Sequence, residues 1–122
     1  MADIQDPAGP PARLSITQTS RDGIRVLTLG GEIDADTAGG FREALCVDET
    51  PTSRTVLDFG AVTFMDSSGV NVLVAAFQNA RAAGGWVRMA ALRAPVRQVI
   101  DIVGLDTVIP CYPTLSEALV AA

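Results

Sequence analysis

A strand-like run, a short polar turn and a helix-like run follow one another in the middle of this chain, and this succession constrains the fold more than any other feature. Residues 55–59 and 62–65 are almost continuously apolar, which is typical of a strand covered on both faces. After the polar turn at 66–69, apolar residues recur at helical spacing, namely Val70, Leu73, Val74, Phe77 and Ala80. Gly84 and Gly85 are expected to end this helix. A buried strand followed by an amphipathic helix predicts an α/β fold.

A hairpin and a helix are predicted before this unit. Residues 14–19 and 24–29 have strand patterns, and Asp22-Gly23 between them suits the positive φ angles of a tight hairpin turn. Gly30 and Gly31 are expected to end the second strand. Asp34 is then a plausible N-cap for a helix, whose apolar positions are Ala38, Phe41 and Leu45. Within it, Gly39 and Gly40 cost about 1 kcal/mol each relative to Ala.

The last third of the chain continues the alternation. The pattern predicts a strand at 86–92, a helix that begins near Pro95 and ends at Gly104, and a short edge strand at 108–112 that contains Pro110. Thr114 and Glu117 have the spacing of a capping box for a closing helix at 115–120. The expected fold is a single α/β domain with the order β-β-α-β-α-β-α-β-α, in which a mixed sheet of four to five strands carries about four α-helices.

Composition narrows the class of protein. A chain of 122 residues with 48% hydrophobic and 19% charged residues is expected to fold as one domain, which we assign to 13–122. The Pro-rich segment 1–12 is expected to be a flexible tail without a secretory signal. The longest apolar run, 72–77, is far shorter than the roughly 18 residues of a membrane helix. We therefore expect a cytoplasmic protein with no membrane partner.

The residue types in the chain argue against several kinds of catalytic, metal and nucleic-acid site. The chain has no His, which removes Ser-His-Asp catalysis and His-containing metal sites. Cys46 and Cys111 have no metal or redox spacing, and the basic residues are scattered, which disfavours nucleic-acid binding. Neither Ser67 nor Ser68 has the Gly-x-Ser-x-Gly pattern of a nucleophile elbow. We expect no enzyme activity, no cofactor and no metal.

The turn Asp66-Ser67-Ser68-Gly69 has two readings. As structure, Asp and Ser are preferred N-caps and Gly permits a tight turn. As function, two hydroxyls at a helix N-terminus form a place where a phosphate is tolerated, because the first N–H groups lack partners and the helix dipole is positive there.

Acidic residues follow two strands of the predicted sheet. Asp34 comes after the second strand and Asp66 after the third. Because functional surfaces of such sheets lie at the carboxyl ends of strands, the two turns should converge on one edge of the domain. Glu32, Asp34 and Asp66 also admit an acid–base pair or a magnesium site, but solvated or capping acids are the more common explanation.

At this point the residues carry a resemblance. The order of elements and the strings Gly-Glu-Ile-Asp at 31–34 and Phe-Met-Asp-Ser-Ser-Gly at 64–69 resemble the STAS family, especially the bacterial anti-sigma factor antagonists, over about residues 14–121. The resemblance implies a protein that binds an anti-sigma factor, itself a serine kinase of the GHKL type, and so frees a sigma factor. It also implies that phosphorylation of the antagonist weakens this complex, and that a PP2C-type phosphatase restores it.

The resemblance also assigns residues. By position, Ser68 is the implied phospho-acceptor and Asp34 matches an aspartate near that site. The implied partner-binding set is Asp34, Met65, Asp66, Ser67, Gly69, Val70 and Asn71. Asn71 departs from the family, where a small residue is common at this place. The alternative function is a STAS interaction module of another assembly, such as a stressosome or a transport system.

Overall fold

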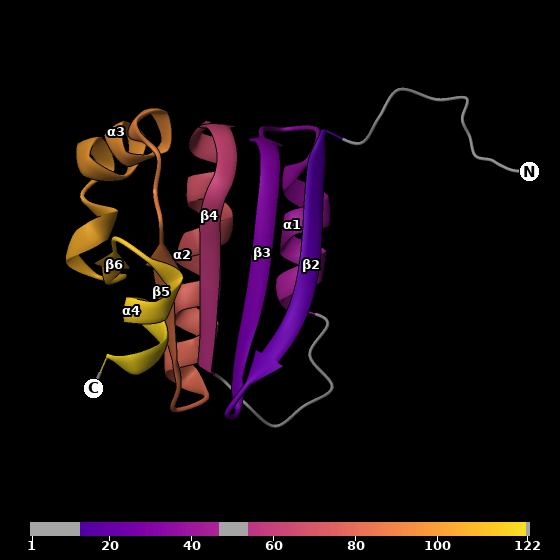
Figure 1. Cartoon of the computed structure of the whole chain (residues 1–122). Helices are drawn as coiled ribbons and strands as arrows, with labels where there is room; N and C mark the ends of the chain where they lie inside the picture. Colours follow the sequence, from indigo (N-terminus) through magenta and orange to yellow (C-terminus); the bar gives the residue numbers. More distant parts are fainter. Residues whose placement is uncertain (1–12, 47–53, 122) are drawn as a thin grey trace, which may run out of the picture.

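Figure 1 shows the computed structural model of the chain, which describes residues 13–46 and 54–121. The expected tail at 1–12 lies outside the described residues. The elements are β2 (Leu14–Arg21), β3 (Ile24–Ile33), α1 (Ala38–Cys46), β4 (Arg54–Met65), α2 (Ser67–Ala82), β5 (Trp86–Ala90), α3 (Ala94–Val103), the 3-10 helix η1 (Leu105–Thr107), β6 (Cys111–Tyr112) and α4 (Leu115–Val120). The predicted order of strands and helices is confirmed.

The sheet is mixed and has five strands in the order β2-β3-β4-β5-β6. β2 pairs with β3 in antiparallel fashion, and every later pair is parallel. In Figure 1, α1 and α2 lie behind the sheet, α4 lies in front of it, and α3 lies beyond the carboxyl end of β5. The parallel pairing brings the carboxyl ends of β3 and β4 to the same edge.

The hairpin turn is the predicted one. Asp22 and Gly23 have φ angles of 53° and 81°, so both central residues are left-handed, as a two-residue turn of this kind requires. The register runs from Arg21 opposite Ile24 to Leu14 opposite Gly31.

β3 is longer than predicted, because Gly30 and Gly31 continue the strand to Ile33 instead of ending it. Both residues pair with β2 on one side and with Ala61 and Val62 of β4 on the other. Gly31 has a φ of +104°, and a Cβ there would overlap the Arg13 carbonyl. The glycine therefore marks an irregular point within a paired strand, where the backbone of β2 approaches closely.

The last two strands are shorter than predicted. β5 ends at Ala90, because the next residue, Ala91, takes a left-handed φ of 59°. β6 contains only Cys111 and Tyr112, because the N–H groups of Val108 and Ile109 donate back to Leu105 O of the preceding 3-10 helix, at 3.1 and 2.9 Å, instead of pairing in the sheet. β6 is an edge strand, as the presence of Pro110 led us to expect.

α2 begins earlier than its apolar pattern indicates. The first apolar position is Val70, but the helix begins at Ser67 with Asp66 as its N-cap. Its C-terminus has the expected glycine cap, since the N–H of Gly85 donates to Ala80 O at 2.8 Å and that of Gly84 to Arg81 O at 3.0 Å.

The core lies between the sheet and the helices. Fully buried side chains of the strands meet those of the helices there, among them Leu27, Leu57, Phe59, Met89, Phe41, Leu73 and Ile100. A second, smaller cluster joins Ala118 of α4 to Ile24, Val56 and Ala90 of the sheet.

Two buried arginines hold helix C-termini, a feature that the sequence did not reveal. Arg25 donates to the carbonyls of Ala44 and Leu45 at the end of α1, at 3.4 and 3.1 Å. Arg88 donates to Ala118 O in α4 at 2.8 Å and stacks on the Trp86 ring at 3.6 Å. A guanidinium is stabilising at a helix C-terminus because the last carbonyls are unpaired within the helix and carry partial negative charge.

Candidate functional site

The two acidic turns converge where β3 and β4 end. Ile33 and Met65 are partners in the parallel ladder, and the N–H of Asp66 donates to Ile33 O at 3.1 Å. Asp34 and Asp66 therefore leave the sheet from neighbouring positions. The expectation that both turns meet at one edge of the domain is confirmed.

Asp66 orders the start of α2. Its carboxylate Oδ1 accepts a hydrogen bond from the Ser68 N–H at 2.8 Å. Its backbone carbonyl accepts from the N–H groups of Gly69 and Val70 at 3.1 and 3.4 Å. Ser67 and Ser68 are thus the first two residues of a 16-residue helix; the former is exposed and the latter half-buried. The turn can therefore be both a structural cap and a phosphorylation site. Asp66 supplies the capping hydrogen bond, and neither serine hydroxyl takes part in that bond.

Gly69 packs closely between α2 and the strands. A Cβ at this position would lie 2.5 Å from Met65 Cγ and 2.8 Å from Ile33 Cγ2. Met65 is itself only 2% exposed. Two of the seven residues in the expected partner-binding set, Met65 and Gly69, are therefore buried in this structure, where they support the turn from beneath. Val70 is half-buried and Asn71 is exposed.

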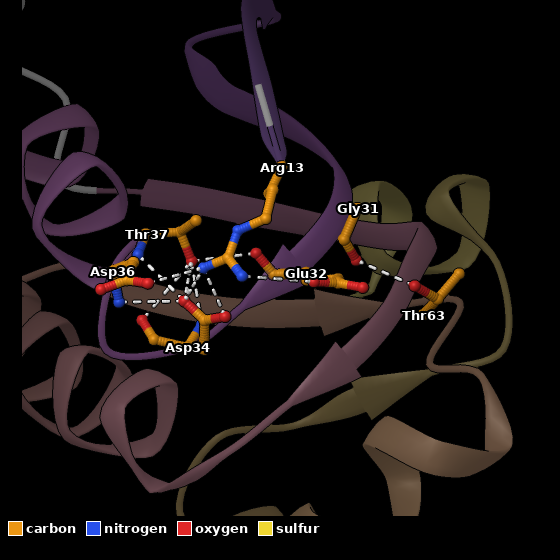
Figure 2. Close-up of polar contacts among 7 residues, drawn as sticks. All are labelled: Arg13, Gly31, Glu32, Asp34, Asp36, Thr37 and Thr63. Atoms are coloured by element: carbon orange, nitrogen blue, oxygen red, sulfur yellow. Dashed lines mark hydrogen bonds and ion pairs between the residues drawn. The ribbon is translucent and has the colours of Figure 1, made fainter. Parts of the chain in front are cut away.

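The Asp34 turn is closed by its own polar groups (Figure 2). Asp34 Oδ1 accepts from the N–H groups of Asp36 and Thr37 at 2.9 and 3.2 Å. The Thr37 hydroxyl accepts from the Asp34 N–H and donates to Glu32 O, both at 2.9 Å. The prediction that Asp34 is the N-cap of the helix is therefore wrong in position: its side chain closes a separate turn over residues 34–37, and α1 begins only at Ala38.

Arg13 completes this cluster from the start of β2 (Figure 2). Its Nη2 lies 2.7 Å from Asp34 Oδ1, 2.6 Å from Asp34 Oδ2 and 3.2 Å from Asp36 Oδ2. Its Nη1 lies 3.9 Å from Glu32 Oε1. Arg13 was not among the predicted site residues. The hairpin register could have indicated it, because pairing of Leu14 with Gly31 places the preceding residue opposite Glu32.

The electrostatics of the turn favour the ionised form of Asp34. Desolvation opposes ionisation, but the hydrogen bonds from the Thr37 and Asp36 N–H groups and the charge of Arg13 outweigh it and lower the pKa of the Asp34 carboxyl. This carboxylate therefore stays charged at neutral pH and keeps its bonds.

The geometry gives little support to a metal or thiol site. Among residues 13–46 and 54–121, no group of three or more His, Cys, Asp or Glu side chains is placed to hold a metal ion. Glu32 and Asp34 face the Arg13 guanidinium instead. Both cysteines are free, and burial raises the pKa of the Cys111 thiol.

None of the helices in the described part of the chain has the length and apolar character to span a bilayer.

Comparison with known proteins identifies the family to which the chain belongs. The family model of the STAS domain matches residues 15–118. The anti-sigma-F factor antagonist RsfB of Mycobacterium tuberculosis is 34% identical over 113 residues, which cover 89% of each chain. The crystal structure of an anti-sigma factor antagonist from Mycobacterium paratuberculosis superposes with a TM-score of 0.82 and 32% identity, and covers 92% of this chain and 96% of that one.

A more distant structure shares the fold. The Bacillus cell fate determinant SpoIIAA in its phosphorylated form superposes with a TM-score of 0.66 at 21% identity, and covers 86% of this chain and 96% of that one. The domain-family match, the sequence identity and the common fold all lead to one assignment. The chain belongs to the STAS domain family, and it is similar over most of its length to anti-sigma factor antagonists.

Proposed function

We propose that this chain is an anti-sigma factor antagonist that is switched by phosphorylation of Ser68. Unphosphorylated, it binds an anti-sigma factor of the GHKL serine-kinase type and thereby releases a sigma factor. Phosphorylation ends this binding, and a PP2C-type phosphatase restores it. The named function of the relatives, RsfB and the M. paratuberculosis protein, supports the first part of this proposal.

The observation that carries the switch is the position of Ser68. It is the second residue of α2, half-buried beside the exposed Ser67, at the edge where the Asp34 turn also lies. A phosphate adds about −1.5 to −2 charges, and a helix N-terminus tolerates an anion. We therefore expect the phosphorylated domain to stay folded. That a protein of this fold, SpoIIAA, has been solved in phosphorylated form agrees with this expectation.

Charge, not refolding, is the proposed means of release. A phosphate on Ser68 would lie close to the Asp66 carboxylate, which already accepts from the Ser68 N–H. A partner surface that complements the unmodified turn would meet an additional negative charge there. Mispaired charge at an interface costs several kcal/mol, and each 1.4 kcal/mol is tenfold in affinity. Exposed Asp36, Ser67 and Asn71 are the side chains we expect a partner to touch at this edge.

Affinity capture from cell extract tests the proposal. Wild type, Ser68→Ala and Ser68→Asp serve as baits, and mass spectrometry identifies the captured proteins. We expect the first two to retain a GHKL-type ATPase and Ser68→Asp to lose it, with an affinity for the purified ATPase at least about 100-fold lower. Incubation of wild type with that ATPase and ATP should place phosphate on Ser68 and not on Ser67.

Ser116 provides the matched control. It is the second residue of α4, exposed, and preceded by the N-cap Thr114, so Ser116→Asp adds the same charge at the same helical position elsewhere. It should bind as wild type does. If all baits capture the same proteins, the switch is refuted. Capture of a transporter or of a stressosome assembly in place of an ATPase would support the alternative STAS functions instead.

A further inference from the structure

Arg13 connects two parts of the candidate surface that are far apart in the sequence. Its backbone carbonyl accepts from the Glu32 N–H at 2.8 Å, which extends the β2–β3 pairing by one residue. Its guanidinium then reaches over the end of β3 to the carboxylates of Asp34 and Asp36 (Figure 2). One residue thus fixes the strand end and the turn that follows it.

We propose that Arg13 is a positioning residue of the partner surface, which holds the Asp34–Thr37 turn in the geometry that the anti-sigma factor binds. This inference rests on the function proposed above. Asp34 itself is poorly placed to reach a partner, because its carboxylate accepts from Arg13 and from two N–H groups of the turn and its side chain is only 19% exposed. Asp36, with an 86% exposed side chain, is the acid that the turn presents outward.

The contact between Arg13 and Asp34 differs from an ordinary surface ion pair. Exposed pairs contribute little to stability, because water screens them and two side chains lose freedom. Here one guanidinium nitrogen lies within 2.7 Å of both carboxylate oxygens, and the same carboxylate already accepts two backbone hydrogen bonds. Loss of Arg13 therefore removes a restraint on a turn whose backbone is otherwise held by Asp34 and Thr37. We expect it to change partner affinity more than it changes folding stability.

Arg13→Gln, with Arg13→Lys as the conservative variant, tests this role. Arg97→Gln is the matched control, because Arg97 pairs with Asp101 at 3.2 Å and is 49% exposed, close to the 45% of Arg13. Calorimetric titration with the GHKL-type ATPase recovered by wild-type capture should give about tenfold weaker binding for Arg13→Gln and unchanged binding for Arg97→Gln. Lysine keeps the charge but lacks the planar fork, so Arg13→Lys should recover only part of the affinity.

NMR on the isolated protein supplies a readout that does not depend on the partner. Arg13→Gln should raise the pH at which the Asp34 carboxyl titrates and should speed hydrogen exchange at the Asp36 and Thr37 amides, whereas Arg97→Gln should change neither. Wild-type titration and exchange in Arg13→Gln would overturn the positioning role. Changed NMR behaviour with wild-type affinity would overturn its importance for binding. If wild type itself binds no ATPase, the proposed function fails and the binding half of this inference fails with it, while the NMR result still decides whether Arg13 holds the turn.

Discussion

The N-termini of α2 and α4 use the same local chemistry but have different surroundings. Asp66 caps α2 through the Ser68 N–H, and Thr114 caps α4 through the Glu117 N–H at 3.1 Å. Each helix has a serine at its second position. At the third position the two helices diverge, because α2 has the buried Gly69 and α4 has the exposed Glu117.

The difference shows what turns a helix cap into a candidate site. α2 begins against Met65 and Ile33, at the junction of two parallel strand ends and beside the Asp34 turn. α4 begins after the edge strand β6, and Glu117 and Ser116 are exposed. A capped helix N-terminus is common, so its placement in the sheet, and not the cap itself, gives the Ser68 turn its functional interest.

The largest expected effect on stability comes from adding a methyl group at Gly69, where the neighbouring side chains leave no room for one. Gly69→Ala would put a methyl group 2.5 Å from Met65 Cγ and 2.8 Å from Ile33 Cγ2. We expect a loss of about 2 kcal/mol in the free energy of unfolding, since overpacked cores relax at the cost of strain. Chemical denaturation measures it.

Gly39→Ala is the control for this change. Nothing lies within 4 Å of a Cβ at Gly39, and the position is in the first turn of α1. We expect this variant to gain roughly 0.5–1 kcal/mol from helix propensity. Equal effects at the two glycines would show that α2 is not pressed against the strands, and the contrast with α4 would lose its basis.

The capping residues are expected to have a smaller and similar effect on stability. Asp66→Ala and Thr114→Ala each remove one cap and should each cost about 1 kcal/mol. They should differ in binding, because only Asp66 orders the turn that carries Ser68. Denaturation of both variants, together with titration of the captured ATPase, checks this. Weakened binding by Thr114→Ala to the same degree would mean that the partner surface extends to α4.

The smallest expected effect is a pH dependence of folding stability that comes from Asp34, in the turn beside the start of α2. The Thr37 and Asp36 hydrogen bonds and Arg13, acting against desolvation, lower the pKa of Asp34 in the folded state. The unfolded chain therefore binds this proton at higher pH, near 4, than the folded chain does. The stabilisation is complete above about pH 4 and is lost as the pH falls through the folded pKa.

Asp34→Asn separates this contribution from the rest of the protein. Asn keeps an oxygen that accepts the N–H groups of Asp36 and Thr37 but cannot ionise. We expect wild type to be the more stable protein at neutral pH, with a difference that narrows below about pH 4, as measured by thermal unfolding at several pH values. A difference that stays constant with pH would contradict the lowered pKa.

Local chemistry predicted most of the elements correctly. The Asp22-Gly23 turn, the glycine cap after α2 and the alternation of strands and helices all depend on residues close together in the chain. The errors lie where distant backbone intervenes. Gly30 and Gly31 have the composition of a strand end, but pairing with both β2 and β4 keeps them in the ladder. The 3-10 helix before β6 shortens the last strand, and no periodic pattern announced it.

The sequence alone determined the fold class and the convergence of the two acidic turns, because apolar periodicity and turn chemistry act over a few residues and parallel strands end at a common edge. The choice of Ser68 as the residue to test came from the resemblance of the sequence to the STAS family. Only the tertiary structure showed that Met65 and Gly69 lie beneath the surface and that Arg13 joins the Asp34 turn. Burial and ion pairing depend on which segments the folded chain brings within a few ångströms of each other. Those distances arise from the packing of α2 on the sheet and of β2 along β3, and no single segment encodes them.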